Sequence, residues 1–127
     1  MNKLSAKELF ITGERLCREY FERRGFQVLA QNFRKKCGEI DLVVRTDEDL
    51  IFVEVKTRSY HSMESALANV SYTKQKKISR TSLEYINLNP EHAKLNVRYD
   101  IIVVFYYPEH GDFALRHLEN AFLPIFD

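Results

Sequence analysis

The amino-acid sequence predicts a small mixed α/β fold in which helices pack against one sheet. Three observations support this: an amphipathic helical pattern opens the chain, three β-rich segments follow between residues 26 and 57, and a second helical pattern precedes another β-rich run. The resulting order of helix, three strands, helix and strand is typical of a sheet with helices layered on it. A chain of 127 residues is long enough to bury its own core, so we expect a single domain over residues 1–127.

The composition is that of an ordinary globular protein, with 45% hydrophobic residues, 29% charged residues and a net charge of +1. This balance gives no strong overall attraction to nucleic acid or membrane, so an anionic partner would need a local basic patch. No apolar run approaches the ~18 residues of a membrane-spanning helix, and the first residues lack a signal-peptide pattern. The cysteines, Cys17 and Cys37, have no metal-binding spacing. We therefore expect a cytoplasmic protein with reduced thiols and no membrane contact.

The first helix is predicted to begin at Ser5, because Ser5 and Glu8 have the spacing of a capping box. It is predicted to run to about Arg24, with Gly25 as its C-terminal stop. Glu14 lies on the apolar stripe that is expected to face the core, an unusual place for an acid. The stripe consists of Phe10, Cys17 and Phe21.

Three strands are predicted after this helix, over residues 26–33, 39–45 and 50–57. The second and third are expected to form a hairpin around the acidic turn at residues 46–49. Residues 61–71 are polar and mixed in pattern, and we expect a loop with some helix there.

The C-terminal half is predicted to contain a helix and two more strands. The helix spans about residues 73–87 and is closed by Pro90. Residues 98–107 form the most β-rich stretch, and residues 101–105 within it have no polar alternation, which is typical of a strand covered on both faces. Residues 113–119 are predicted to form one more strand after a turn.

Charged residues interrupt the hairpin where a buried sheet should be apolar. Because side chains alternate along a strand, Glu54 and Lys56 share one face of the third strand. Asp41 can approach Glu54 across the hairpin, and two such carboxylates repel each other unless a positive charge lies between them. A hard cation such as Mg²⁺, which binds carboxylate oxygens, is the natural occupant. The other face of the second strand is expected to be apolar, with Ile40, Leu42 and Val44.

A structural interpretation competes with this one. A glutamate and a lysine two residues apart on a strand frequently form only a solvated face, and Glu54 and Lys56 alone favour that alternative. The addition of Asp41, and of Glu14 on a packed helix face, shifts the interpretation toward a functional site.

Two segments, GEIDL at residues 38–42 and FVEVKTR at residues 52–58, resemble the signature of PD-(D/E)xK nucleases. That signature belongs to the restriction-endonuclease-like fold shared with archaeal Holliday-junction resolvases. The chain more closely resembles the YraN-like family of bacterial proteins, over about residues 8–122. Further motifs of this resemblance are Gly13-Glu14, Asn32-Phe33-Arg34, a second helix rich in lysine from Lys74, RYDIIVV and Glu119-Asn120-Ala121-Phe122.

The resemblance implies a restriction-endonuclease-like αβββαβ core, in which a mixed central sheet is flanked by helices. It also implies that Asp41 and Glu54 bind Mg²⁺ or Mn²⁺, together with the backbone carbonyl of Val55. Lys56 would be the catalytic base or would position the attacking water, and Glu14 would complete the metal site. Ile40 stands where the signature has proline, at a position that supplies no ligand.

The implied substrate is nucleic acid, in particular DNA that is structured or branched. Basic and amide side chains could contact backbone phosphate, although for each one alone a solvated surface position is the alternative. The candidates are Arg34, Lys35, Arg58, Lys74, Gln75 and Lys77. Resolvase-like relatives often act as dimers, which makes a homodimer one option.

Two other polar groups receive a structural interpretation. The four histidines share no metal-ligand spacing and are expected at the surface. Asp100 opens the buried strand and is expected to pair with Arg98 or to cap a turn.

Three functions are therefore compatible with the sequence. The first is a metal-dependent endonuclease that hydrolyses phosphodiester bonds in DNA. The second is a nucleic-acid-binding module that keeps the nuclease scaffold without its chemistry. The third is an interaction protein whose charged strand residues form a structural salt-bridge network.

Overall fold

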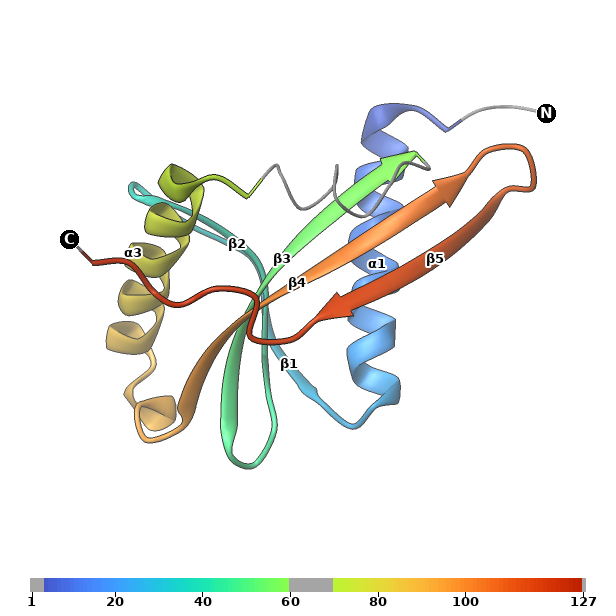
Figure 1. The fold of residues 1–127 in the computed structure, drawn as a ribbon. Coiled ribbons are helices and arrows are strands. Elements are labelled where there is room, and N and C mark those ends of the chain that lie inside the picture. The colour runs from blue at the N-terminus through green and yellow to red at the C-terminus, as the bar shows by residue number, and fades with distance from the viewer. Residues whose placement is uncertain (1–3, 60–69, 127) are drawn as a thin grey trace.

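The structure, a computed structural model, describes residues 4–59 and 70–126, so the predicted loop at 61–71 lies almost entirely outside the described residues. The order of elements confirms the predicted αβββαβ core, to which a final strand is added (Figure 1). The elements are α1 (Ala6–Arg23), β1 (Gln27–Lys35), β2 (Gly38–Arg45), β3 (Asp49–Ser59), α3 (Tyr72–Leu88), the short 3-10 helix η1 (Pro90–His92), β4 (Asn96–Tyr107) and β5 (Asp112–Leu118).

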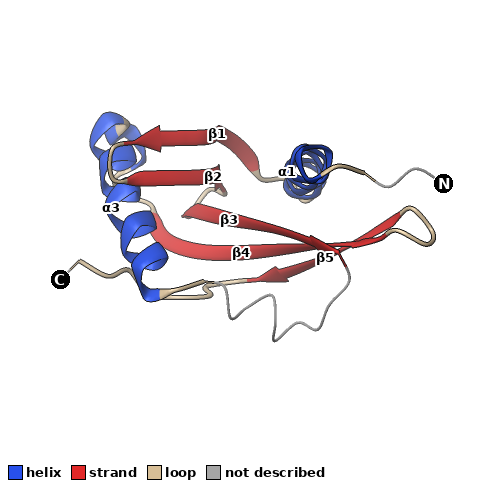
Figure 2. Ribbon diagram, turned by 90° about the horizontal axis from the view of Figure 1, so that it is seen from above, coloured by secondary structure: helices blue, strands red, loops and turns tan. Residues whose placement is uncertain are grey.

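The strands form one five-stranded sheet in the order β1-β2-β3-β4-β5. All neighbours are antiparallel except β3 and β4, which are parallel, so the sheet is mixed as expected. A parallel pair needs a crossover connection, and α3 lies within it. Viewed from above, α1 and α3 lie apart from each other, on different sides of the sheet (Figure 2). In the described residues neither helix is long and apolar enough to cross a membrane.

Alternation along the strands separates the hydrophobic residues on the two faces of the sheet. One cluster lies under each helix, and a third includes Ile101, Val103 and Phe105 of β4. Cys17 and Phe21 of α1 pack on a cluster that includes Ile51 and Val53 of β3. The neighbouring β3 residue Phe52 points to the other face, where it packs with α3.

Two expectations about this core are wrong. Ile40 packs in the cluster under α3 and does not share a face with Leu42 and Val44. Phe10 is 45% exposed because it precedes the part of α1 that lies on the sheet.

The start and the middle of α1 follow from local sequence. Ser5 and Glu8 form the predicted capping box, since the backbone N–H of each donates to the side chain of the other, at 2.9 and 3.1 Å. Gly13 is buried against β3, and a Cβ at this position would overlap Oγ1 of Thr57. Glycine therefore permits a close approach between α1 and β3, and this approach brings Glu14 toward the sheet.

The sheet divides between β2 and β3. Their pairing ends at Leu42 and Val53, and the next pair would be Asp41 and Glu54. Beyond this point β2 continues with β1 as far as the Lys35–Gly38 pair, whereas β3 continues with β4. Figure 1 shows the β1–β2 hairpin and the β3–β4 pair diverging from there. We call this place the fork of the sheet, and Asp41 and Glu54 lie in it.

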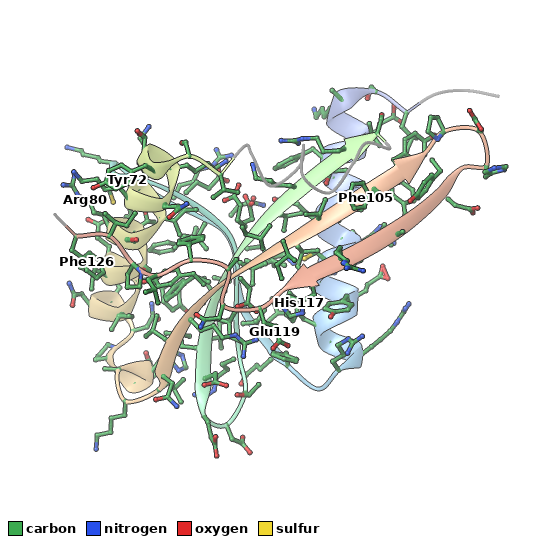
Figure 3. All side chains as sticks on the ribbon, in the orientation of Figure 1. Tyr72, Arg80, Phe105, His117, Glu119 and Phe126 are labelled. Atoms are coloured by element: carbon green, nitrogen blue, oxygen red, sulfur yellow. The ribbon has the colours of Figure 1, made fainter. Side chains whose placement is uncertain are left out.

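A second polar cluster lies at the start of β4, around the fully buried carboxylate of Asp100. Arg98 donates two hydrogen bonds to it at 2.9 Å, which confirms the predicted pair, and the backbone N–H of Asn120 donates a third. The surface prediction for the histidines is wrong for His117, which bonds Asp100 through Nε2 at 2.7 Å and Tyr20 through Nδ1 at 2.9 Å. Figure 3 shows His117 between β5 and α1. This cluster fixes the C-terminal segment and α1 to the sheet.

Candidate active site

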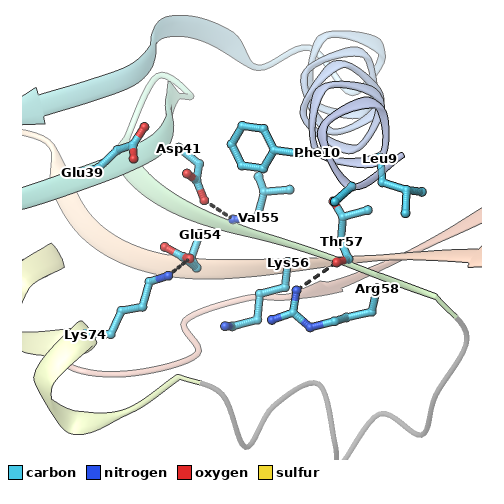
Figure 4. A pocket seen from close by; sticks show the side chains of 11 residues that line it. Leu9, Phe10, Glu39, Asp41, Glu54, Val55, Lys56, Thr57, Arg58 and Lys74 are labelled. Atoms are coloured by element: carbon cyan, nitrogen blue, oxygen red, sulfur yellow. Dashed lines mark hydrogen bonds and ion pairs between the residues drawn. The ribbon is translucent and has the colours of Figure 1, made fainter. Parts of the chain in front are cut away.

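The three residues that carry the motif lie together at the fork. Asp41, Glu54 and Lys56 are 8%, 6% and 3% exposed. The backbone N–H of Val55 donates to Oδ2 of Asp41 at 2.7 Å, a bond that takes the place of strand pairing where β2 and β3 separate (Figure 4). The predicted approach of Asp41 to Glu54 is therefore present, and the interrupted pairing explains how two acids fit inside a sheet.

The fork opens into a groove that passes over both acids. Two adjoining hollows of about 410 and 330 Å³ share Asp41 and Glu54, and with them Glu39 and Lys74. One hollow reaches the first turns of α1, where Leu9 and Phe10 form an apolar wall (Figure 4), and the other reaches the start of α3. We call the two hollows together the acidic groove. Its remaining lining residues are Ala6, Gly38, Val55, Lys56, Thr57, Arg58, Ser71, Thr73, Lys77 and Ile78.

Burial and charge act together on Asp41. Desolvation is the largest cause, followed by the nearby carboxylate of Glu54, and they raise the pKa of Asp41 to about 8 although the bond from Val55 opposes them. The carboxylates of Glu14 and Glu39 add to the increase. Asp41 is thus a site that favours a proton or a metal cation, because either one offsets a buried negative charge.

Two lysines approach the acids from the same groove. Burial lowers the pKa of Lys56, and the ammonium of Lys74 lowers it further, while Glu54 opposes the change. Lys74 forms an ion pair with Glu54, with 2.7 Å between Nζ and Oε1. Burial would lower the pKa of Lys74, but the hydrogen bond and the charge of Glu54 outweigh burial and raise it. The sequence did not predict the Lys74–Glu54 pair, since the two residues are distant in the chain.

Glu14 is not among the residues that line the acidic groove. Burial raises the pKa of Glu14, although a hydrogen bond from Asn32 opposes the change. Its Oε2 is buried and, within residues 4–59 and 70–126, has no hydrogen-bond partner. A buried oxygen in this condition is unfavourable unless a ligand or a proton satisfies it.

The side chains at the fork fit a hard divalent cation. Mg²⁺ takes oxygen ligands and typically keeps several waters, so one or two carboxylates are enough to hold it. Asp41 and Glu54 supply these, and the unsatisfied Oε2 of Glu14 is a further oxygen near them. Across the described part of the chain, no three His, Cys, Asp or Glu side chains converge closely enough to hold an ion by themselves. The site therefore fits an ion bound by two carboxylates and water, and the role of Glu14 stays a prediction.

Only some of the residues predicted to contact nucleic acid line the acidic groove. Arg58, Lys74 and Lys77 line the acidic groove. Gln75 faces a different hollow, beside Phe122, and its amide donates to the carbonyl of Val70.

The last two candidates lie in the β1–β2 hairpin. Arg34 is bound to Glu39 at 3.0 Å, and Lys35 lies over the ring of Phe33. The sequence also missed Phe10 and Leu9 as groove residues, because Phe10 has the spacing of a core residue and an apolar residue such as Leu9 gives no sign of a polar groove.

Comparison with known proteins identifies the family. The model of "Uncharacterised protein family UPF0102" matches residues 13–104, a range that contains Asp41, Glu54 and Lys56. A UPF0102 protein of Clostridium botulinum (strain Loch Maree / Type A3) is 32% identical over 116 residues, which cover 91% of this chain and 94% of the relative. A UPF0102 protein of Rhodopseudomonas palustris is 33% identical over 120 residues, with coverage of 94% and 87%. These matches confirm the resemblance to the YraN-like family, and this chain therefore belongs to the UPF0102 family.

Proposed function

We propose that this protein is a metal-dependent endonuclease of the PD-(D/E)xK type, which hydrolyses phosphodiester bonds in DNA. The observation that carries the proposal is the buried pair Asp41 and Glu54 at the fork of the sheet. Lys56, which is also buried, follows Glu54 two residues later on β3. Two carboxylates in a desolvated site are costly for stability, so an arrangement of this kind is typical of a functional site.

Each residue of the motif has a role in this proposal. A divalent cation such as Mg²⁺ or Mn²⁺ would supply a Lewis acid and would lower the pKa of an attacking water. Asp41 and Glu54 would hold that cation, assisted by the carbonyl of Val55 and by Glu14. Lys56 would orient the attacking water and offset the negative charge that develops on the phosphoryl group. Its lowered pKa, which follows from burial and from Lys74, brings the amine closer to the range in which it can also accept a proton.

The form of the groove favours a polynucleotide substrate and an internal cut. The acidic groove extends from the acid pair toward α1 in one direction and toward α3 in the other. A strand can therefore continue on both sides of the phosphate that is attacked. Arg58 and Lys77 lie along the groove, where they could contact backbone phosphates and offset the charge of the acids.

The test is cleavage of a panel of single-stranded, duplex, flap and four-way-junction DNAs in Mg²⁺ or Mn²⁺, with the same structures in RNA. We expect the wild type to cut at least one of them in a metal-dependent manner, and Lys56→Met and Asp41→Asn to lose this activity by at least about 100-fold. Lys94→Met, in the exposed turn before β4, is the matched control and should cut normally. Lys56→Met that cuts as well as the wild type would refute the proposed mechanism.

A second function, binding of nucleic acid without cleavage, is favoured by one specific observation. The ammonium of Lys74 already neutralises Glu54, and a carboxylate in such a pair has less need of a metal. For a binding module we expect a gel shift in EDTA and no cleavage of any substrate in Mn²⁺.

A further inference from the structure

The ion pair between Lys74 and Glu54 joins a long, half-exposed lysine side chain to a buried carboxylate. Glu54 is on the central strand β3 and its side chain is 6% exposed, whereas the side chain of Lys74 is 45% exposed. The backbone of Lys74 is fixed, because its N–H donates to the cap residue Ser71 at 3.1 Å. The lysine stem has four rotatable bonds and is free to change direction from this fixed point. The ammonium can therefore leave the acid without any change in α3 or in the sheet.

The ammonium of Lys74 lies against the carboxylate of Glu54, which is the group that would bind the metal. Mg²⁺ binds carboxylate oxygens at about 2.0–2.1 Å, and the Nζ of Lys74 lies 2.7 Å from Oε1 of the same carboxylate. Two cations so close to one carboxylate repel each other strongly, because the surroundings of Glu54 are largely dry. Lys56 and Arg58 also line this part of the groove and add positive charge.

From this geometry we infer that Lys74 is a displaceable counter-ion, which holds Glu54 in the metal-free protein and leaves it when a divalent cation binds. The inference rests on the proposed metal-dependent function and adds a role for a residue outside the nuclease motif. Lys74 lines both hollows of the acidic groove, so the released ammonium stays where a phosphate would lie. Metal binding and phosphate contact are thereby coupled through one side chain.

The first test is titration calorimetry with Mg²⁺ at pH 8.5 and low salt. Lys74→Met removes the competing ammonium and keeps most of the apolar stem, and we expect it to bind Mg²⁺ roughly 3- to 5-fold more tightly than the wild type. Lys77→Met is the matched control, since Lys77 lines the same groove from the next turn of α3 without the bond to Glu54. It should change the affinity by less than about twofold.

The second test uses the wild-type protein and needs no variant. Acetylation of individual lysines by a water-soluble amine reagent is measured by peptide mass spectrometry, with and without saturating Mg²⁺. We expect Mg²⁺ to raise the rate of Lys74 acetylation severalfold, because an amine that has left the ion pair with Glu54 is more accessible to the reagent. The rate for Lys77 should stay constant, and in Asp41→Asn the response of Lys74 should disappear.

The outcomes separate this inference from the proposed function. If the wild type binds Mg²⁺ and cleaves DNA while Lys74→Met binds Mg²⁺ equally or more weakly, Lys74 is not a competitor and the inference alone is wrong. If the acetylation rate of Lys74 is the same with and without bound Mg²⁺, the inference alone is likewise wrong. If neither protein binds Mg²⁺, the metal-dependent function fails and the inference fails with it.

Discussion

Asp41 gives the sharpest prediction, because burial and the neighbouring carboxylate of Glu54 raise the pKa of its carboxyl group far above that of an exposed aspartate. The substitution Asp41→Asn removes the ionisable group and keeps the shape of the side chain. The amide oxygen of asparagine can still accept the hydrogen bond that the N–H of Val55 donates at 2.7 Å. The variant therefore isolates the effect of the charge.

The magnitude follows from the pKa of Asp41, which burial and Glu54 raise from 3.8 to about 8. Between these two pH values the folded protein holds a proton that the unfolded chain has released, so unfolding becomes more favourable as the pH rises. The wild type should lose stability in this window, by at most about 1.4 kcal/mol per pH unit. Asp41→Asn lacks this loss. From pH 5 to 7.5 we expect it to gain about 1–3 kcal/mol of unfolding free energy relative to the wild type.

The assay is urea unfolding in EDTA at several pH values from 5 to 8, followed by circular dichroism because the chain contains no tryptophan. The control is Asp47→Asn, which removes a carboxylate from the exposed turn between β2 and β3 and should track the wild type. Stability profiles of the wild type and Asp41→Asn that run parallel over this pH range would show that the fork does not hold a protonated carboxyl group.

Three further predictions concern the metal, the close approach of α1 and the second polar cluster. Mg²⁺ at about 100 times its dissociation constant should raise the unfolding free energy of the wild type by about 2.7 kcal/mol, and thermal melting should show no such shift for Asp41→Asn; equal shifts would exclude the fork as the binding site. Gly13→Ala should lower the unfolding free energy by about 1–3 kcal/mol, because its methyl group would overlap Thr57; a more stable variant in urea would contradict the close contact. Asp100→Asn should lower the unfolding free energy by about 3 kcal/mol at neutral pH, since it leaves Arg98 without its buried partner. Burial would raise the pKa of Asp100, but the bonds from His117 and Arg98 outweigh it and lower the pKa, so this stabilisation is present above the ordinary pKa and is lost as the pH falls below it. Urea unfolding should accordingly show a smaller difference between wild type and variant at pH 3, and an unchanged difference would contradict this explanation.

The elements of the fold could be predicted because their causes are local. The capping box at Ser5 and the unbroken apolar run in β4 depend on residues close together in the chain, and both predictions are confirmed. Local patterns were less informative at the ends and edges of elements. Phe10 has the spacing of a core residue, but α1 extends past the sheet there and leaves it 45% exposed. His117 gave no signal at all, because its partners Asp100 and Tyr20 come from other elements.

The candidate site was predicted only in part for the same reason. Alternation along β3 places Glu54 and Lys56 on one face whatever the rest of the chain does. The approach of Asp41 to Glu54 depends on hairpin register, which short turns and apolar patterning define well. By contrast, Ile40 lies on the face opposite to the predicted one. The pairing of β2 with β3 ends at Leu42, just before this residue, and no local sequence pattern marks the end of a strand pairing.

The sequence by itself determined the order of helices and strands and the residue types available for chemistry, since these depend on composition and on short-range periodicity. Its motifs, rather than its composition, carried the resemblance to the family. Only the tertiary structure decided that the sheet divides at Asp41 and Glu54, and that Lys74 of a distant helix holds one of the two acids. Both features depend on contacts between segments that are distant in the chain: β3 continues along β4 where its pairing with β2 ends, and α3 packs on the sheet beside it.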